Sequence, residues 1–263
     1  MSGRTRGMAP EAPGSKTALW WLTARPIAHR GLHNCAHGII ENTASAAAAA
    51  IEGRYGIEAD LQVSADGEAM VFHDDTLDRL TVSSGTLRDM SAAALRQVPL
   101  RSTADHMMTL GDLIDVVAGR TTLVLELKSR FDGDLRLAAR TAAVLGGYRG
   151  PVAVMSFDPA LIVELRRIAP HIVRGIAAGH HFPLSVWDSL NAAQRLELTF
   201  LLHAWKSRPG FLAYRVEDLP AVPPRVARLL FGLPLLTWTV RSARDRALAA
   251  RLADQMIFEG VLD

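Results

Sequence analysis

Short apolar runs, many of them rich in β-branched residues, recur along the chain and are separated by stretches with helical spacing of apolar positions. Apolar runs of about 4 to 8 residues are typical of strands buried on both faces of a parallel sheet. Strand followed by helix, repeated eight times, closes a barrel. The fold class we expect is therefore α/β, a TIM (β/α)8 barrel. The predicted strands are 26–29, 56–61, 122–127, 151–155, 172–176, 211–214, 234–238 and 255–258.

Helical patterns fill the intervals between these runs, and the predicted helices are 43–52, 109–117, 135–145, 159–168, 224–230 and 243–252. Two intervals are longer than a simple connection. The first, about 66–108, is predicted to be a small insertion after the second barrel strand, in which a hairpin strand at 68–72 lifts His73 over the barrel. The second, 179–210, is apolar and predicts a helix with its own buried face, with a hydrophobic lid as the alternative.

The length of 263 residues fits one barrel, which needs roughly 250, and leaves no room for a second sizeable domain. The division we expect is a flexible N-terminal lead with a short helix over residues 1–24, followed by a single barrel over residues 25–263.

Charged residues stand where the second predicted strand ends. Glu58 and Asp60 are two positions apart, so in a strand both side chains project from the same face into one small space. Two carboxylates forced together repel each other unless a cation or a shared proton intervenes. This pair therefore predicts a metal site.

Two other predicted strands end in the same way, one in His29 and Arg30 and the other in Glu126 and Lys128. In α/β barrels the carboxyl ends of the strands carry the loops and the open cavity. We therefore expect three strands to direct six side chains into one pocket: His29, Arg30, Glu58, Asp60, Glu126 and Lys128.

Five short motifs, in order and at compatible spacing, resemble those of the glycerophosphodiester phosphodiesterases. Each is weak alone, but the ordered set is specific. The motifs are His29-Arg30-Gly31, Glu41-Asn42-Thr43, Glu58-Ala59-Asp60-Leu61-Gln62 with Asp66-Gly67, Val71-Phe72-His73-Asp74 and Glu126-Leu127-Lys128. The resemblance continues more weakly through Ser156-Phe157-Asp158 and Thr237-Trp238-Thr239-Val240, so it covers nearly the whole chain after about residue 25.

The chain departs from the family pattern at two places. Ile40 stands where the family usually has Pro, and Phe258-Glu259-Gly260 replaces the usual Thr-Asp near the last strand. We expect neither position to carry the chemistry, although the second alters the mouth of the barrel.

The resemblance implies a hydrolase that cuts a glycerophosphodiester to sn-glycerol 3-phosphate and an alcohol. Phosphodiester cleavage needs a base for the attacking oxygen and an acid for the leaving oxygen, and histidine suits both tasks near neutral pH. A lone histidine such as His73 is more often structural, but the matching motifs around it favour His29 and His73 as the catalytic pair. Which of the two is the acid stays open.

Three carboxylates offer only oxygen ligands, which favours one hard divalent cation, Mg²⁺ or Ca²⁺, at Glu58, Asp60 and Glu126. The alternative is a cluster of salt bridges with Arg30 and Lys128. Both interpretations can hold together, because these two cations are also suited to bind substrate phosphate. Trp238 is expected to line the glycerol pocket, with core packing as the alternative.

The composition, 49% apolar and 21% charged, is that of a globular protein, and the net charge of +2 mildly favours anionic partners but gives no argument for nucleic acid. Cys35 is the only cysteine, which excludes an intramolecular disulfide and a thiolate cluster. No run approaches the ~20 apolar residues of a membrane span. We expect a cytoplasmic protein without stable membrane insertion, acting on a small-molecule phosphodiester; the oligomeric state stays open.

Two other functions fit the same residues. The first is a lysophospholipase D acting on membrane-derived lysophospholipids, in which Trp20, Trp21 and the apolar interval 179–210 contact lipid. The second is a non-catalytic barrel that only binds phosphodiesters. The presence of both histidines and all three acids argues against the second, because a silent binding protein needs no such combination.

Overall fold

The structure, a computed structural model, describes residues 19–180 and 190–260. The flexible lead expected before the short N-terminal helix lies outside the described residues. So do Phe182 and Trp187 of the long apolar interval.

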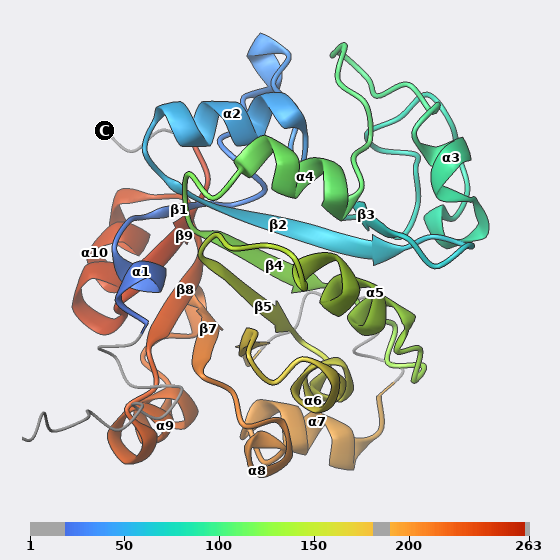
Figure 1. Cartoon of the computed structure of the whole chain (residues 1–263). Coiled ribbons are helices and arrows are strands. Elements are labelled where there is room, and N and C mark those ends of the chain that lie inside the picture. Colours follow the sequence, from blue (N-terminus) through green and yellow to red (C-terminus); the bar gives the residue numbers. More distant parts are fainter. Residues whose placement is uncertain (1–18, 181–189, 261–263) are drawn as a thin grey trace, which may run out of the picture.

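A parallel barrel is closed by pairing between its first and last strands (Figure 1). β1 pairs with both β2 and β9, and the order between them is β2-β4-β5-β6-β7-β8-β9. β3 is antiparallel to β2 and lies outside the ring, so eight strands form the barrel, and the predicted TIM fold is confirmed. The strands are β1 (Ile27–Ala28), β2 (Gly56–Val63), β3 (Ala69–Val71), β4 (Leu123–Leu127), β5 (Val152–Ser156), β6 (Val173–Ala178), β7 (Phe211–Arg215), β8 (Leu235–Val240) and β9 (Gln255–Phe258).

Helices surround the barrel, and all six predicted helices are present within the described residues. Several begin at a side chain that accepts a hydrogen bond from the first turn, as Thr43 and Thr109 do for α2 and α4. The helices are α1 (Trp20–Thr23), α2 (Ala44–Glu52), α3 (Ala92–Leu95), α4 (Leu110–Val117), α5 (Arg136–Leu145), α6 (Pro159–Ile168), α7 (Ala192–Thr199), α8 (Ala204–Ser207), α9 (Val222–Phe231) and α10 (Ala243–Leu252), with 3₁₀ turns η1 (Cys35–His37), η2 (Leu87–Asp89) and η4 (Val216–Asp218).

The short helix α1 covers the end of the barrel where the strands begin. Leu22 is fully buried among interior side chains of the strands, including Phe211. Two hydrogen bonds fix the helix there: Thr122 Oγ1 donates to the Trp21 carbonyl at 2.9 Å, and Gln255 Nε2 donates to the Thr23 carbonyl at 2.9 Å. Because Thr122 and Gln255 stand at the starts of β4 and β9, α1 seals the amino-terminal end of the barrel.

The interval 66–108 contains β3, η2 and α3 and has a small apolar core of its own. Met70, Phe72 and Leu87 belong to this cluster and are almost completely buried. β3 runs back along the carboxyl end of β2, with Leu61 opposite Val71. This pairing brings His73, two residues after β3, over the end of the barrel where the strands stop.

The interval after β6 contains the expected helix, α7, followed by α8. Leu198 and Leu201 are buried, but Phe200 and Leu202 are about half exposed. The segment therefore packs on the barrel with only part of its apolar surface.

Candidate active site

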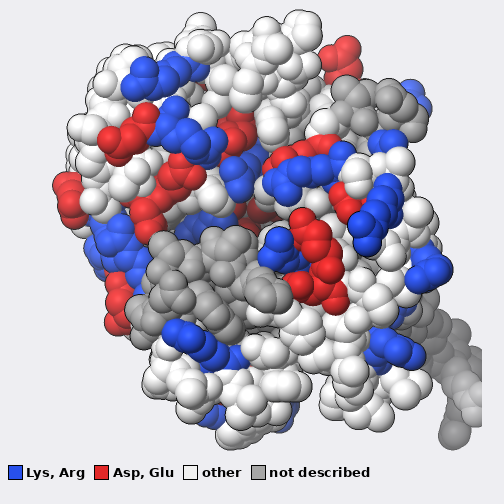
Figure 2. Space-filling view, turned by 180° about the vertical axis from the view of Figure 1, so that it is seen from behind, with Lys and Arg blue, Asp and Glu red and all other residues white. Residues whose placement is uncertain are grey.

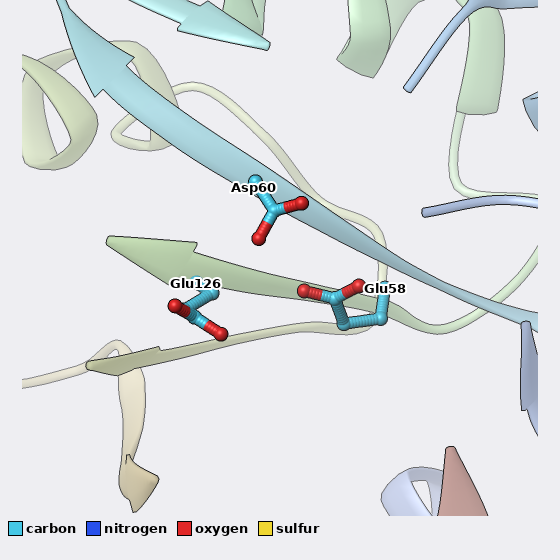
Figure 3. A group of neighbouring side chains, drawn as sticks. All are labelled: Glu58, Asp60 and Glu126. Atoms are coloured by element: carbon cyan, nitrogen blue, oxygen red, sulfur yellow. The ribbon is translucent and has the colours of Figure 1, made fainter. Parts of the chain in front are cut away.

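Three carboxylates from β2 and β4 lie close together (Figure 3). Asp60 and Glu126 are register partners on these neighbouring strands, and Glu58 lies two residues before Asp60 on the same face of β2. All three residues are buried, and each offers an oxygen atom within 4.8 Å of the others. The structure thus brings together the acids that the sequence assigned to a metal.

The electrostatics of this group fit a bound cation. Burial raises the pKa of Glu58 well above its ordinary value, and the charges of Asp60 and Glu126 raise it further. Glu58 Oε1 is buried and has no hydrogen-bond partner among the described residues. A divalent cation bound by these oxygens would relieve the repulsion and satisfy that atom.

Positive side chains balance part of this charge. Lys128 Nζ lies 2.8 Å from Asp60 Oδ1 and 2.5 Å from Glu126 Oε1, and Arg30 Nε lies 3.2 Å from Asp60 Oδ2. Burial alone would raise the pKa of Asp60, but Lys128, with His73 and Arg30, holds it below its ordinary value. The salt-bridge cluster considered from the sequence is therefore present at the same acids as the candidate metal site.

The loop after β1 carries His29 and Arg30 into this group. Gly31 has φ +77° and would place a Cβ 2.8 Å from Ala46 of α2, so only glycine allows the loop to pass beneath that helix. Within this turn the Arg30 backbone N–H donates to Glu58 Oε2 at 3.0 Å. The turn thus orients one oxygen of a candidate metal ligand.

His29 has a carboxylate partner that the sequence interpretation missed. Its Nδ1 lies 2.5 Å from Glu259 Oε1, while its Nε2 faces the acid cluster, 3.8 Å from Glu58 Oε2. Burial lowers the pKa of His29, and the hydrogen bond to Glu259 opposes this shift. Position 259, which the sequence interpretation set apart from the chemistry, thus has a side chain that contacts a candidate catalytic group. No local pattern at the end of the last strand revealed this, since the pair is 230 residues apart in the sequence.

Arg241 holds Glu259 in place with two hydrogen bonds, from Nε at 2.5 Å and from Nη2 at 3.0 Å. Burial would raise the pKa of Glu259, but the bonds from His29 and Arg241 lower it below its ordinary range. A charged carboxylate favours the tautomer of His29 with its proton on Nδ1, which leaves Nε2 to face the pocket.

His73 is supported in a similar way from the insertion. Its Nδ1 lies 2.7 Å from Asp74 Oδ1, and Arg79 contacts both Asp74 and Glu41. Glu41 in turn accepts from Arg30 Nη1 at 2.7 Å. A continuous chain of ion pairs thus joins the two candidate catalytic loops, and neither Arg79 nor Glu41 had been assigned a role from the sequence.

The two histidines, together with Glu58 and Glu126, line a cavity of about 320 Å³. Its polar wall contains His29, His73 and Lys128, and its apolar wall contains Phe157 and Trp238. The two aromatic rings meet edge to face with centroids 5.4 Å apart, and the indole N–H donates to the Ala213 carbonyl at 3.1 Å. Trp238 therefore both lines the pocket and packs against the barrel, so the two interpretations considered for it are compatible.

The rim of the cavity is charged. Arg215, Glu217 and Arg241 stand there, and Arg215 forms an ion pair with Glu217. Figure 2, the view from behind, shows acidic and basic side chains gathered around a hollow on this face of the molecule.

Comparison with known proteins indicates the family of the chain. The family model described as the glycerophosphoryl diester phosphodiesterase family matches residues 29–262. A glycerophosphodiester phosphodiesterase of Caldanaerobacter subterraneus is 27% identical over 160 residues, which are 57% of this chain and 65% of that protein. Glycerophosphodiester phosphodiesterase 1 of Bos taurus is 40% identical over 83 residues, 31% of this chain and 24% of that protein. The matches thus span less than two thirds of the length of these relatives.

Solved structures show the same fold. A phosphodiesterase from Oleispira antarctica, solved in complex with the product sn-glycerol-3-phosphate, superposes with a TM-score of 0.71 at 23% identity, covering 90% of this chain and 94% of that chain. A putative glycerophosphoryl diester phosphodiesterase from Silicibacter pomeroyi gives 0.69 at 24% identity, covering 89% of each chain.

The closed parallel barrel, with charged side chains in its pocket, is thus a TIM barrel like those of the solved structures. Because the family model matches nearly the whole chain, the protein belongs to the glycerophosphodiester phosphodiesterase family, as the motif order had indicated.

Proposed function

We propose that the protein hydrolyses glycerophosphodiesters to sn-glycerol 3-phosphate and an alcohol, with one divalent cation as cofactor. The observation that carries the proposal is a cluster of three buried carboxylates at a cavity that two carboxylate-supported histidines also line. Family membership and the product bound in the Oleispira antarctica structure support the same chemistry.

Glu58, Asp60 and Glu126 are the residues that would hold Mg²⁺ or Ca²⁺, since all three offer oxygen from one buried face. When bound, such a cation polarises a phosphate oxygen and offsets its charge. Arg30 and Lys128 line the cavity beside these acids and add positive charge for the phosphate.

His29 and His73 are the proposed acid–base pair. Each has its Nδ1 engaged by a carboxylate, Glu259 or Asp74, which orients the ring and leaves Nε2 available for proton transfer. One ring takes the proton of the attacking oxygen and the other gives a proton to the leaving oxygen. The attacking oxygen is either water, which gives the product directly, or the neighbouring glycerol hydroxyl, which gives a cyclic phosphate that water then opens. The symmetry of their support leaves the order of the two roles open.

The substrate class we propose is the water-soluble diesters. The cavity of about 320 Å³ is at the small end of the range for ligand pockets, and its rim carries Arg215, Glu217 and Arg241. Such a rim suits a polar headgroup better than an acyl chain. Trp238 and Phe157 offer an apolar wall for the glycerol carbons.

The test is an assay of glycerol 3-phosphate release from glycerophosphocholine and glycerophosphoethanolamine, beside lysophosphatidic acid release from a lysophospholipid. EDTA should abolish activity and Mg²⁺ or Ca²⁺ should restore it. His29→Ala and His73→Ala should each lower kcat at least ~10²-fold, the usual scale of general acid–base catalysis. His106→Ala, at an exposed histidine of the insertion, is the matched control. A fully active His73→Ala protein contradicts the mechanism, and preferred turnover of the lysophospholipid contradicts the substrate class.

A further inference from the structure

Most large apolar side chains that are exposed in the described residues belong to α1, to the α7–α8 segment and to α9. Elsewhere only Val82, Leu135 and Val163 are of this kind within residues 19–180 and 190–260. The exposed set is Trp20, Leu196, Phe200, Leu202, Trp205, Val222, Val226, Leu229, Leu230 and Phe231. Monomeric soluble proteins rarely expose apolar residues in such a group without a partner.

Half of this set lies around the sealed end of the barrel. α1 directly precedes β1, α8 directly precedes β7, and the last turn of α9 directly precedes β8. Because these strands are parallel, all three segments lie at the amino-terminal edge, and Figure 1 shows α8 and α9 next to each other. We name the group Trp20, Trp205, Leu229, Leu230 and Phe231 the basal patch.

Two contacts join the parts of the chain that adjoin these helices. A Cβ atom on Gly210, three residues after α8, would lie 3.9 Å from Leu19 Cδ1 at the start of α1. The Leu212 N–H of β7 donates to the Pro234 carbonyl, three residues after α9, at 2.9 Å. The basal patch is therefore drawn from three chain segments at the same end of the barrel.

The patch protrudes into solvent. Trp205 is 71% exposed, Leu229 84% and Phe231 68%, so these side chains stand clear of the barrel. Such protruding aromatic and aliphatic side chains are the kind that enter the headgroup region of a bilayer, where tryptophan is especially favoured.

Positive charge surrounds the patch. Arg25, Lys206 and Arg208 are exposed beside it, and Lys206 Nζ lies 5.0 Å from the centroid of the Trp205 ring. The nearby acid Asp254 is occupied by Arg228, whose Nη2 lies 3.1 Å from Oδ1. This combination complements an anionic lipid surface.

We propose that the basal patch docks the protein on the surface of an anionic lipid bilayer. A second copy of the chain is disfavoured as the occupant, because a symmetric dimer through this patch would bring the two sets of cations together. Within the described residues no helix is both long and apolar enough to cross a membrane.

Docking by this end sets the direction of the catalytic cavity. The cavity opens at the carboxyl ends of the strands, and the patch lies at their amino ends, so the mouth faces away from the lipid. If the proposed hydrolase activity holds, the docked protein takes substrate from the aqueous phase and not from the bilayer. The patch thus favours water-soluble diesters over membrane-embedded lysophospholipids.

The experiment is co-sedimentation of the full chain with vesicles of phosphatidylglycerol and phosphatidylcholine in equal parts, compared with phosphatidylcholine alone. The wild type should bind the anionic vesicles, and added salt should weaken binding. The double variant Leu229→Asp with Phe231→Asp should lower the partition coefficient at least about tenfold, because two apolar insertions are lost and two negative charges gained. Both sites are exposed, so folding is preserved.

The control is Val82→Asp, which changes an apolar residue of the insertion that is 60% exposed and lies away from the basal patch, and this variant should bind like the wild type. Absence of wild-type binding to anionic vesicles overturns the proposal, as does an equal loss in the Val82 variant. Light scattering that shows a dimer, dissociated by the double variant, also overturns it and assigns the patch to a second copy. Turnover of glycerophosphocholine, measured in parallel, should be unchanged in all variants and separates this test from that of the activity.

Discussion

Replacing Glu259 tests directly whether this carboxylate orients the ring of His29. We expect Glu259→Ala to lower kcat about 10 to 100-fold, the usual cost of removing an outer partner of a functional histidine. The carboxylate accepts from His29 Nδ1 at 2.5 Å and is not among the residues that line the cavity, so its loss frees the ring without removing a substrate contact. KM should therefore change little.

This fall in kcat corresponds to a loss of about 1.4 to 2.7 kcal/mol of transition-state stabilisation, at about 1.36 kcal/mol for each factor of ten. Glu259→Gln retains an acceptor for the Nδ1 proton but loses the charge, so it should lie between wild type and Ala. Glu259→Asp retains the charge on a shorter side chain and should restore part of the rate. Stability should barely change, because the Arg241 side chain released by the substitution is 54% exposed and can be solvated.

The assay is steady-state release of glycerol 3-phosphate, with kcat and KM separated and thermal melting recorded for each variant. Glu217→Ala is the matched control, since this carboxylate lies on the rim, pairs with Arg215 and does not touch His29. The reasoning is refuted if Glu259→Ala keeps kcat within about twofold of wild type, or if only KM changes.

Three other substitutions test the fold and the site. Lys128→Met removes the buried cation between Asp60 and Glu126 and should destabilise the protein by about 3 to 5 kcal/mol in EDTA, with part of the loss recovered on adding Ca²⁺ in a melting experiment. Burial lowers the pKa of His203 to about 4, so below about pH 6.5 the unfolded chain binds a proton that the folded chain does not. The free energy of unfolding should therefore fall by up to about 3 kcal/mol between about pH 6.5 and 4. Urea unfolding of the wild type and of His203→Gln over this pH range isolates the contribution of His203. Leu22→Ala should lower the free energy of unfolding by about 2 to 5 kcal/mol, because the side chain is fully buried. Trp20→Ala changes a side chain that is 67% exposed and should alter it by no more than about 0.5 kcal/mol. Equal effects would contradict the role of α1 in covering the barrel end.

The barrel was predictable because its signal is local and repeated. Each strand is an apolar run of its own, as in Leu123–Leu127, and each capped helix begins at a recognisable residue such as Thr43. The acids Glu58 and Asp60 were predictable for the same reason, since two-residue spacing within one strand fixes a common face.

The partners of the histidines were harder to predict. Asp74 adjoins His73, but the support of Asp74 by Arg79 and of Arg79 by Glu41 joins two loops that are distant in sequence. Glu259 meets His29 only because the first and last strands pair when the barrel closes, with Ala28 opposite Phe258. Such contacts form only when the barrel closes and brings its first and last strands together, and no short sequence motif indicates which side chains then meet.

Because α1 covers the amino-terminal end of the barrel, the cavity opens only at the carboxyl end of the strands among the described residues. Leu22 and its neighbours block the far end, so whatever enters past Arg215 and Arg241 must leave by the same route. If the proposed hydrolase activity holds, the alcohol and the glycerol phosphate share this one exit. Accumulated glycerol 3-phosphate should then compete with incoming diester for the single entrance, so that the rate depends on how quickly that product is removed.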